Sequence, residues 1–177
     1  MPQATPLLTD LVTLVGSTLA PLDTLLATAT DRVRATVSVD GKVKAPLLEE
    51  HQRAAHGLAW LATYIESIRQ MHAWAERLTG SGGFGEMEAL QLQIGAGEYL
   101  WQIWGGIPMT QGEILRLQDI GLSQEEQMPL TDPAIMTLTQ QGNSPAARAR
   151  LVELMRKNQG RATFGATGLD DELEMIR

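Results

Sequence analysis

The chain has 177 residues, of which 44% are hydrophobic and 20% charged, and its formal net charge is −7. This composition supports one domain with a hydrophobic core and argues against wholesale disorder. The negative charge disfavours nucleic acids and anionic membranes as partners, and the absence of cysteine excludes disulfides, thiolate catalysis and zinc–thiolate sites. No secretory signal and no run of roughly 18 apolar residues is present, so we expect a cytoplasmic protein without a transmembrane helix.

The first expected helix runs from about Leu7 to Ala35, because leucines and valines recur there at helical spacing. Pro21 lies inside this pattern and should kink or restart the helix, since proline lacks an N–H group. Short extended segments flank Asp40 and Gly41, a dipeptide typical of tight turns. They predict a very small hairpin after the helix.

The second expected helix is long, with apolar residues at helical spacing from Pro46 to Leu78. The glycine-rich stretch 80–85 should end it, and because no strand precedes this stretch we interpret it as a flexible connection, not a nucleotide-binding loop. A third helix is expected over about Glu86–Trp104. Gly95 and Gly97 interrupt it, each at a cost of about 1 kcal/mol relative to alanine, and should allow a neighbouring helix to approach closely.

Thr110 and Glu113 have the spacing of a capping box, which predicts a fourth helix that ends at Gly121. The polar stretch 123–131 is then expected to be a linker. Two short helices should follow, because Asp132-Pro133 and Ser144-Pro145 each combine a helix-capping residue with proline at the first helical position. We therefore expect an all-α fold built on a four-helix bundle.

Few residues predict chemistry. His51 and His56 are five residues apart, which does not suit a metal pair on one helix, and His72 has no glutamate three residues before it. We therefore interpret the histidines as surface or packing residues and expect no metal site. Glu66 and Glu98 could form an acid–base pair in a pocket, but solvated helix faces are the favoured interpretation. No catalytic residue is predicted.

Aromatic residues are concentrated in the second and third expected helices. Large aromatic side chains dominate core energetics, so packing between helices is the favoured interpretation. A ligand groove or a subunit interface is the alternative, because exposed tryptophans are common at interfaces. The candidate residues are Trp60, Tyr64, Trp74, Tyr99, Trp101 and Trp104.

Two stretches resemble acyl-CoA dehydrogenases. Residues 168–177 (GLDDELEMIR) are similar to the opening of the first helix of that family's N-terminal α domain. Residues 100–120 (LWQIWGGIPMTQGEILRLQDI) are similar to a segment of its C-terminal four-helix bundle that carries a Q-I-x-G-G pattern. The matching positions in this segment are Gln102, Ile103, Gly105, Gly106, Thr110, Arg116 and Asp119.

The resemblance divides the chain into a bundle at 1–122, a linker with two short helices at 123–168, and the truncated start of the family's N-terminal α domain at 169–177. It implies a parent enzyme that uses FAD to oxidise a short or branched acyl-CoA. In that family the Gly-Gly segment helps to hold FAD, which makes Gly105, Gly106 and Thr110 candidates for cofactor contact.

The chain departs from the family pattern at the positions that carry catalysis. The glutamate expected after the Arg116–Asp119 stretch is missing, as are the arginine-bearing Q-F-G motif and the middle β-domain. We therefore expect a structural, non-catalytic N-terminal extension that binds no cofactor by itself. Its implied partners are the rest of the enzyme, the enzyme's homo-oligomer and, for the parent enzyme, an electron-transferring flavoprotein. The alternative is a stand-alone helical interaction protein or a small-ligand-binding bundle with a cavity lined by Trp101, Trp104 and Tyr64.

Overall fold

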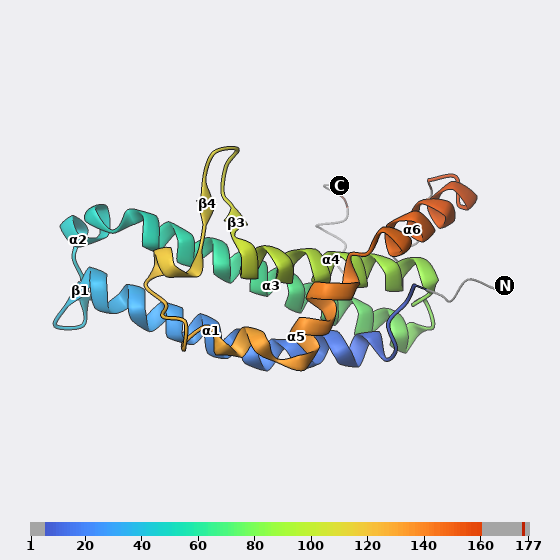
Figure 1. Cartoon of the computed structure of the whole chain (residues 1–177), viewed down its shortest axis with the longest axis horizontal. Helices are drawn as coiled ribbons and strands as arrows, with labels where there is room; N and C mark the ends of the chain where they lie inside the picture. Colours follow the sequence, from blue (N-terminus) through green and yellow to red (C-terminus); the bar gives the residue numbers. More distant parts are fainter. Residues whose placement is uncertain (1–5, 161–174, 176–177) are drawn as a thin grey trace.

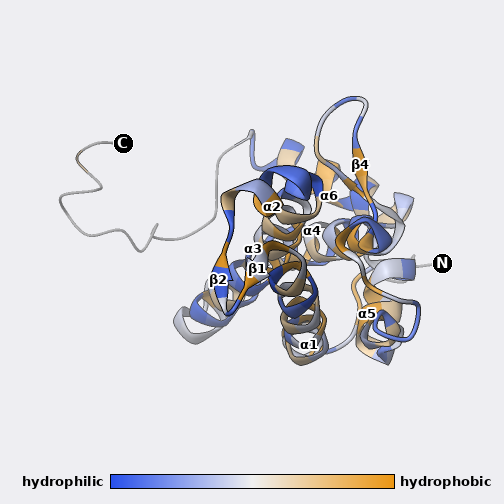
Figure 2. Cartoon of the chain, turned by 90° about the vertical axis from the view of Figure 1, so that its left-hand side faces the viewer, coloured by the Kyte–Doolittle hydropathy of each residue, from blue (hydrophilic) through white to orange (hydrophobic). Residues whose placement is uncertain are grey.

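Three long helices lie side by side and form the body of the molecule. The structure is a computed structural model that describes residues 6–160 and Met175. The helices are α1 (Leu11–Val37), α3 (Gln52–Ser81) and α4 (Glu86–Gly105). Figure 1 shows them as an elongated bundle, and the end view in Figure 2 shows a fourth helix, α5, beside α1. The all-α fold class is confirmed.

Helix α1 buries one continuous face. Its buried residues recur about every three or four positions, which places them on one side of the helix against α3. They are Leu11, Val15, Thr18, Leu22, Leu25, Ala29, Val33 and Val37. The helix passes through Pro21 without a restart, so the restart, one of the two alternatives expected there, is wrong. The buried face thus runs along the whole helix.

By length and composition, α1 could also span a membrane, and it is the one helix in the described part of the chain that meets this test. We expected no transmembrane helix because the sequence lacks an unbroken apolar run. Alanine, glycine and threonine residues between the leucines make α1 apolar without such a run. Several of these threonine hydroxyls form hydrogen bonds within the helix. The Thr24 hydroxyl donates to the Ala20 carbonyl, and the Thr28 hydroxyl donates to the Thr24 carbonyl. The buried face of α1 packs against α3, and 28% of its most apolar stretch is buried in the described part of the molecule.

The second expected helix is divided in two. Helix α2 (Ala45–Glu50) ends at His51, whose φ and ψ of −107° and 23° are not helical, and α3 begins at Gln52. Before it, strands β1 (Ser38–Val39) and β2 (Lys42–Val43) pair as the predicted small hairpin. Helix α3 ends at Gly82, where a φ of 73° directs the chain out of the helix.

The predicted fourth helix at 110–121 is wrong. Strands β3 (Ile107–Pro108) and β4 (Ile114–Leu115) form a hairpin there, followed by the 3₁₀ turn η1 (Leu117–Ile120). Thr110 and Glu113 exchange backbone hydrogen bonds of 3.3 and 3.4 Å across the hairpin tip and do not cap a helix. In Figure 1 the hairpin projects from the body of the molecule.

The segment expected to be a linker supplies the fourth side of the bundle. The 3₁₀ turn η2 (Met128–Thr131) and α5 (Pro133–Thr137) pack on α1, and the π-helical turn η3 (Leu138–Gly142) packs on α4. Gly97 makes this contact possible, because a Cβ atom there would lie 2.8 Å from the Leu138 carbonyl oxygen. The prediction that this glycine admits a close neighbour is confirmed.

Both predicted proline-containing helix starts are confirmed. Asp132 accepts a hydrogen bond of 2.8 Å from the Ala134 N–H, and Ser144 accepts one of 3.2 Å from the Ala147 N–H. The second cap opens α6 (Pro145–Lys157), which extends away from the bundle in Figure 1. The expected helix at 169–177 lies outside the described residues apart from Met175. The division of the chain into three regions stays a prediction.

Candidate functional site

The six aromatic candidates fall into three separate groups. Tyr64 is buried between α3 and α4, with its ring centroid 6.3 Å from that of Trp60 and 4.7 Å from that of Tyr99, both edge-on. Trp74 packs edge-on against Phe84 at a centroid distance of 6.4 Å. Trp101 and Trp104 differ from the others, because they are 55% and 45% exposed. The structure thus separates packing aromatics from two that face outward.

The glycine candidates shape the chain and do not line a hollow. Gly106 has a φ of 135°, a conformation that favours glycine, and it turns the chain from α4 into the hairpin. The space that its Cβ would occupy is filled by the Ile114 side chain, 2.4 Å away. Nothing lies within 4 Å of the corresponding position at Gly105, and Thr110 is exposed at the hairpin tip.

A first hollow, with a volume of about 470 Å³, lies between α4 and the π-helical turn. Glu98 and Trp101 of α4 form one wall, and Thr139, Gln140 and Asn143 form the other. Gly97, also in its lining, allows the two backbones to approach closely at this place. The result is an open site with one carboxylate, several amide groups and one tryptophan.

The carboxylate of Glu98 is held in a chain of hydrogen bonds. Tyr64 donates to the Gln102 side-chain oxygen at 2.6 Å, and the Gln102 amide donates to Glu98 at 2.7 Å. Asn143 also donates to Glu98, and the Arg148 guanidinium lies 3.6 Å away. Burial, followed by the proximity of Tyr99 and Glu98, raises the pKa of Tyr64 above its ordinary value. Tyr64 is therefore a hydrogen-bond donor at neutral pH.

A second hollow, of about 270 Å³, lies further along α4. Trp104 of α4 forms part of its lining together with Gln118, Gln124, Gln127 and Met128. Met128 is 57% exposed. Trp101 and Trp104 line different hollows, and Tyr64 lines neither of these two.

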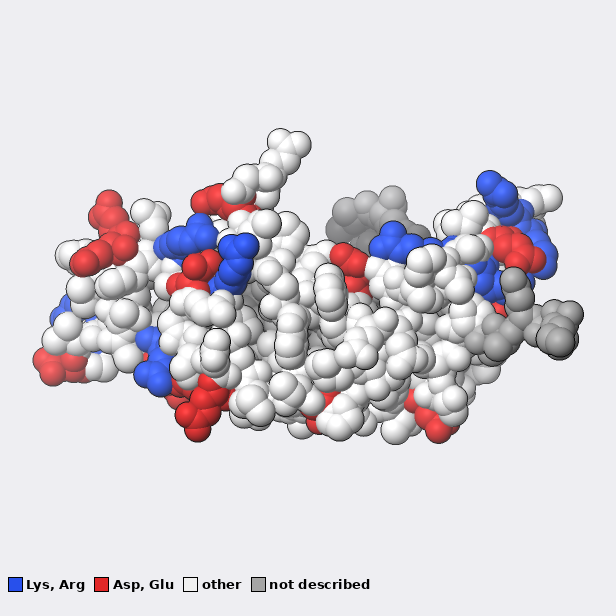
Figure 3. All heavy atoms as spheres, viewed as in Figure 1, with Lys and Arg blue, Asp and Glu red and all other residues white. Residues whose placement is uncertain are grey.

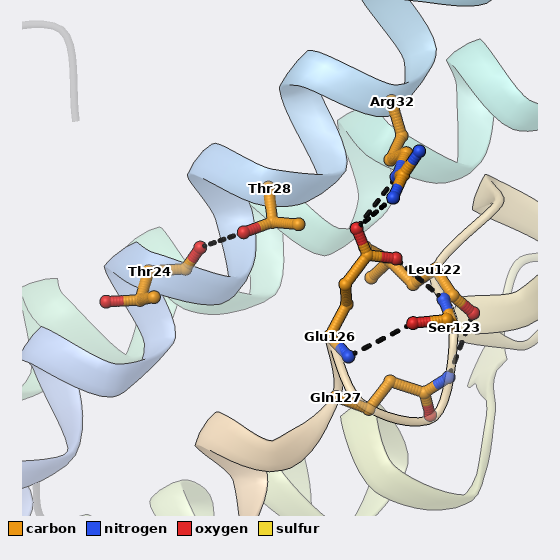
Figure 4. Close-up of polar contacts among 7 residues, drawn as sticks. All are labelled: Thr24, Thr28, Arg32, Leu122, Ser123, Glu126 and Gln127. Carbon is orange, nitrogen blue, oxygen red and sulfur yellow. Dashed lines mark hydrogen bonds and ion pairs between the residues drawn. The ribbon is translucent and has the colours of Figure 1, made fainter.

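An ion pair fixes the loop that carries this second hollow. Arg32 of α1 donates to Glu126 at 2.8 Å, and the other carboxylate oxygen of Glu126 accepts from the Ser123 N–H at 2.9 Å (Figure 4). These hydrogen bonds, that from Ser123 first and that from Arg32 next, lower the pKa of Glu126. Gln127 then donates to the Leu122 carbonyl at 3.1 Å. The loop is thereby held on α1 as a defined surface.

The two glutamates considered as an acid–base pair lie in different hollows. Glu66 is exposed and accepts hydrogen bonds from Arg69 and Gln70, which lower its pKa, the Gln70 contribution being the larger. It lines a separate hollow on α3. Within residues 6–160, no three His, Asp or Glu side chains are grouped as metal ligands. His56 instead accepts a hydrogen bond of 3.0 Å from the Trp60 indole.

Sequence reasoning named Gln102 only as a position of the resemblance, and it missed Asn143 and Met128. Gln102 and Asn143 owe their place to the contact between α4 and the π-helical turn, and the glycines Gly97 and Gly142 were the available signal for it. The two glycines approach so closely that a Cβ at either position would lie 3.1 Å from the Cα atom of the other glycine. Nothing in the local pattern around Met128 indicated its position beside Trp104.

The sequence comparisons support the resemblance found in residues 100–120 and 168–177. No protein-family model matches the chain. The chain is 59% identical, over 172 residues, to (2S)-methylsuccinyl-CoA dehydrogenase of Cereibacter sphaeroides. The alignment covers 97% of the chain and 31% of that protein, so the chain spans about a third of the length of the curated relative it matches. The predicted likeness is thus confirmed: the chain is similar to one segment of a protein named (2S)-methylsuccinyl-CoA dehydrogenase.

Proposed function

We propose that the chain is a helical segment of an FAD-dependent acyl-CoA dehydrogenase, and that this segment is structural and not catalytic. The parent enzyme would oxidise a short or branched acyl-CoA, such as (2S)-methylsuccinyl-CoA, at the α,β bond. The observation that carries the proposal is the 59% identity over nearly the whole chain to a protein of that name. Placement of the segment as an N-terminal extension is part of the proposal and rests on the resemblance of residues 168–177.

The glycine candidates do not fit a flavin in this chain alone. A cradle for a cofactor needs backbone that a ligand can approach, but Ile114 already fills the space over Gly106. Gly105 lies in the open, with no atom of the hairpin or of α3 near its Cβ position. We therefore propose that FAD is held by the rest of the parent enzyme, and we derive no catalytic step for these residues.

The carboxylate in the first hollow is also a poor general base. A base must have a free lone pair aimed at the proton it removes. Glu98 instead accepts hydrogen bonds from Gln102 and Asn143 and faces Arg148, so its oxygens are already engaged within the chain. This arrangement is typical of a structural anchor between α4 and the turn before α6.

The remaining partners follow from the parent enzyme. We propose that the segment contacts the rest of the enzyme polypeptide and its homo-oligomer, and that electrons from the parent enzyme pass to an electron-transferring flavoprotein. We further propose a cytoplasmic location without a role for nucleic acid or membrane. The packing of α1 on α3, which gives its apolar residues a place in the bundle, supports this interpretation.

An assay of the chain alone tests the proposal. Residues 1–177 are purified, supplied with FAD and (2S)-methylsuccinyl-CoA, and assayed for reduction of an artificial electron acceptor. The Cereibacter sphaeroides relative, treated in the same way, is the positive control. We expect no turnover and no retained flavin absorbance for the chain alone. Turnover above the enzyme-free blank would disprove the non-catalytic role.

Deletion of the aligned segment from the relative gives the complementary measurement. If the segment is structural, its removal should lower the thermal midpoint or the oligomeric state of the relative more than its affinity for FAD. Equal thermal midpoints and oligomeric states with and without the segment would contradict a structural role.

A further inference from the structure

We infer that the exposed C-terminal end of α4, with the two hollows beside it, is the surface on which the remainder of the acyl-CoA dehydrogenase polypeptide docks. The tryptophan face, as we name it, consists of Trp101, Trp104 and Met128 together with the two hollows beside them. The inference rests on the proposed function, because it takes the rest of that enzyme as the occupant.

Three large hydrophobic side chains stand exposed on this face. Trp101 and Trp104 are three residues apart on α4, so they lie on the same side of the helix. They are 55% and 45% exposed, and Met128, which shares the second hollow with Trp104, is 57% exposed. Tryptophans that are half-exposed beside hollows are typical of binding hot spots, since a partner can bury them and fill the hollows at once.

The tryptophan face carries little charge. Among the described residues that line its two hollows, Glu98 alone is ionisable, and the polar groups are otherwise amides and hydroxyls. Figure 3 shows charged side chains gathered toward both ends of the molecule, with few across the broad middle. Depletion of charge around central aromatics distinguishes interface cores from ordinary surface.

The length of the relative indicates what covers the face. More than two thirds of that protein lies outside the alignment with this chain, so a much larger body belongs with the segment. A permanent interface between the segment and this body would be more apolar than a transient one, like a domain core cut in half. A transient electron-transfer partner would instead be steered by charge and would bury a smaller area. The tryptophan face, with Glu98 as the one ionisable residue in the linings of its two hollows, therefore suits the enzyme body better than an electron-transferring flavoprotein.

Helix α6 provides a matched control surface. Val152 and Met155 are also three residues apart on a helix, and they are 47% and 45% exposed. They therefore reproduce the spacing and exposure of the two tryptophans without the aromatic rings.

Site-specific photocrosslinking identifies the occupant directly. The enzyme is expressed from the complete reading frame that contains this chain, with benzoylphenylalanine at position 101 or, as the control, at position 152. After irradiation, crosslinked peptides are identified by mass spectrometry. We expect position 101 to crosslink to residues of the enzyme that lie outside this segment, in the same or a neighbouring subunit.

Three results would overturn the inference. They are crosslinks from position 101 only to another copy of residues 1–177, crosslinks from position 152 but none from position 101, and a reading frame that encodes no further polypeptide. The last result would overturn the proposed function as well. The first two leave that function intact, because it is judged by the activity of the isolated segment.

A double substitution gives an independent measure. Loss of a hot-spot side chain lowers the equilibrium constant for docking about tenfold. Trp101→Ala with Trp104→Ala should therefore increase opening of the docked segment by about a hundredfold, measured as hydrogen exchange of α4 peptides in the full-length enzyme. Val152→Ala with Met155→Ala should leave this exchange unchanged. Equal exchange in the two double variants would count against docking through the tryptophan face.

Discussion

Two successive stretches of helix α4 differ in their surroundings, although Gln93, Gly97, Trp101 and Trp104 follow one another along the same side of the helix. In the buried stretch, Gln93 is fully buried and Gly97 contacts the π-helical turn directly. In the exposed stretch, Trp101 and Trp104 are about half exposed beside two open hollows. The difference indicates that one helix serves both as a core element of the bundle and as a surface available to something larger.

Loss of the buried side-chain amide of Gln93 should have the largest effect on stability. Gln93 accepts from the Leu8 N–H at 2.8 Å and donates to the Pro6 and Gly142 carbonyls at 3.0 and 3.1 Å. Gln93→Leu keeps the size but leaves these three backbone groups unpaired, so we expect a loss of about 3 kcal/mol in the free energy of unfolding. Urea denaturation of the chain measures this. A loss below about 1 kcal/mol would show that the three groups find other partners.

A methyl group at the closest helix contact should cost somewhat less. In Gly97→Ala the new Cβ would meet backbone atoms of Leu138, Gly142 and Asn143, which cannot rotate away. Overpacking of this kind should destabilise the chain by about 2 kcal/mol. Gly105→Ala is the matched control on the same helix, since its Cβ would enter open space. Equal unfolding midpoints for the two variants would refute the close contact.

Substitutions in the exposed stretch of α4 should hardly affect the stability of the isolated chain. Trp101→Ala removes a side chain that is more than half exposed, so we expect less than about 1 kcal/mol of lost stability. Trp101→Ala should therefore have little effect on unfolding of the isolated chain but a large effect on docking in the full-length enzyme. A loss comparable to that of Gly97→Ala would mean that Trp101 belongs to the core of the bundle.

Acid should produce the smallest effect, at the margin of the second hollow. The pKa of Glu126 in the folded chain lies below its ordinary value of 4.5. The pair with Arg32 therefore stabilises the loop above about pH 4.5 and loses this effect as the pH falls through the folded-state value. The difference in urea midpoint between the native chain and Arg32→Gln should be present at pH 7 and disappear in strong acid. A difference that is independent of pH would exclude the ion pair as its cause.

The sequence predicted the helices where the local pattern and the packing agree. The apolar period of α4, the small hairpin at Asp40-Gly41 and the caps at Asp132 and Ser144 all depend on neighbours in the chain, and the structure contains each of them. The close approach at Gly97 was also predictable, because a glycine in a helix interior carries a cost that packing must offset.

The errors occur where distant residues override a local signal. Thr110 and Glu113 fit a capping box, but Leu115 inserts where Gly57 of α3 leaves space, and Arg53 donates to the Ile114 carbonyl at 3.0 Å. These contacts hold the stretch extended. The candidate site was predictable in its aromatic residues but not in their division. Burial of Tyr64 depends on how α3 packs against α4, and Trp101 lies at a hollow bordered by the π-helical turn.

The contact between Leu115 and Gly57 has a practical consequence for engineering. The strands of the hairpin are located by α3, through that contact and through Arg53, and not by the tip that joins them. A Cβ at Gly112, in the tip, would have nothing within 4 Å. A peptide tag or fluorophore-accepting sequence inserted there would extend an existing turn away from the bundle, because exposed loop tips tolerate added length. The tip is thus a suitable position for a reporter that leaves both the buried and the exposed stretch of α4 unchanged.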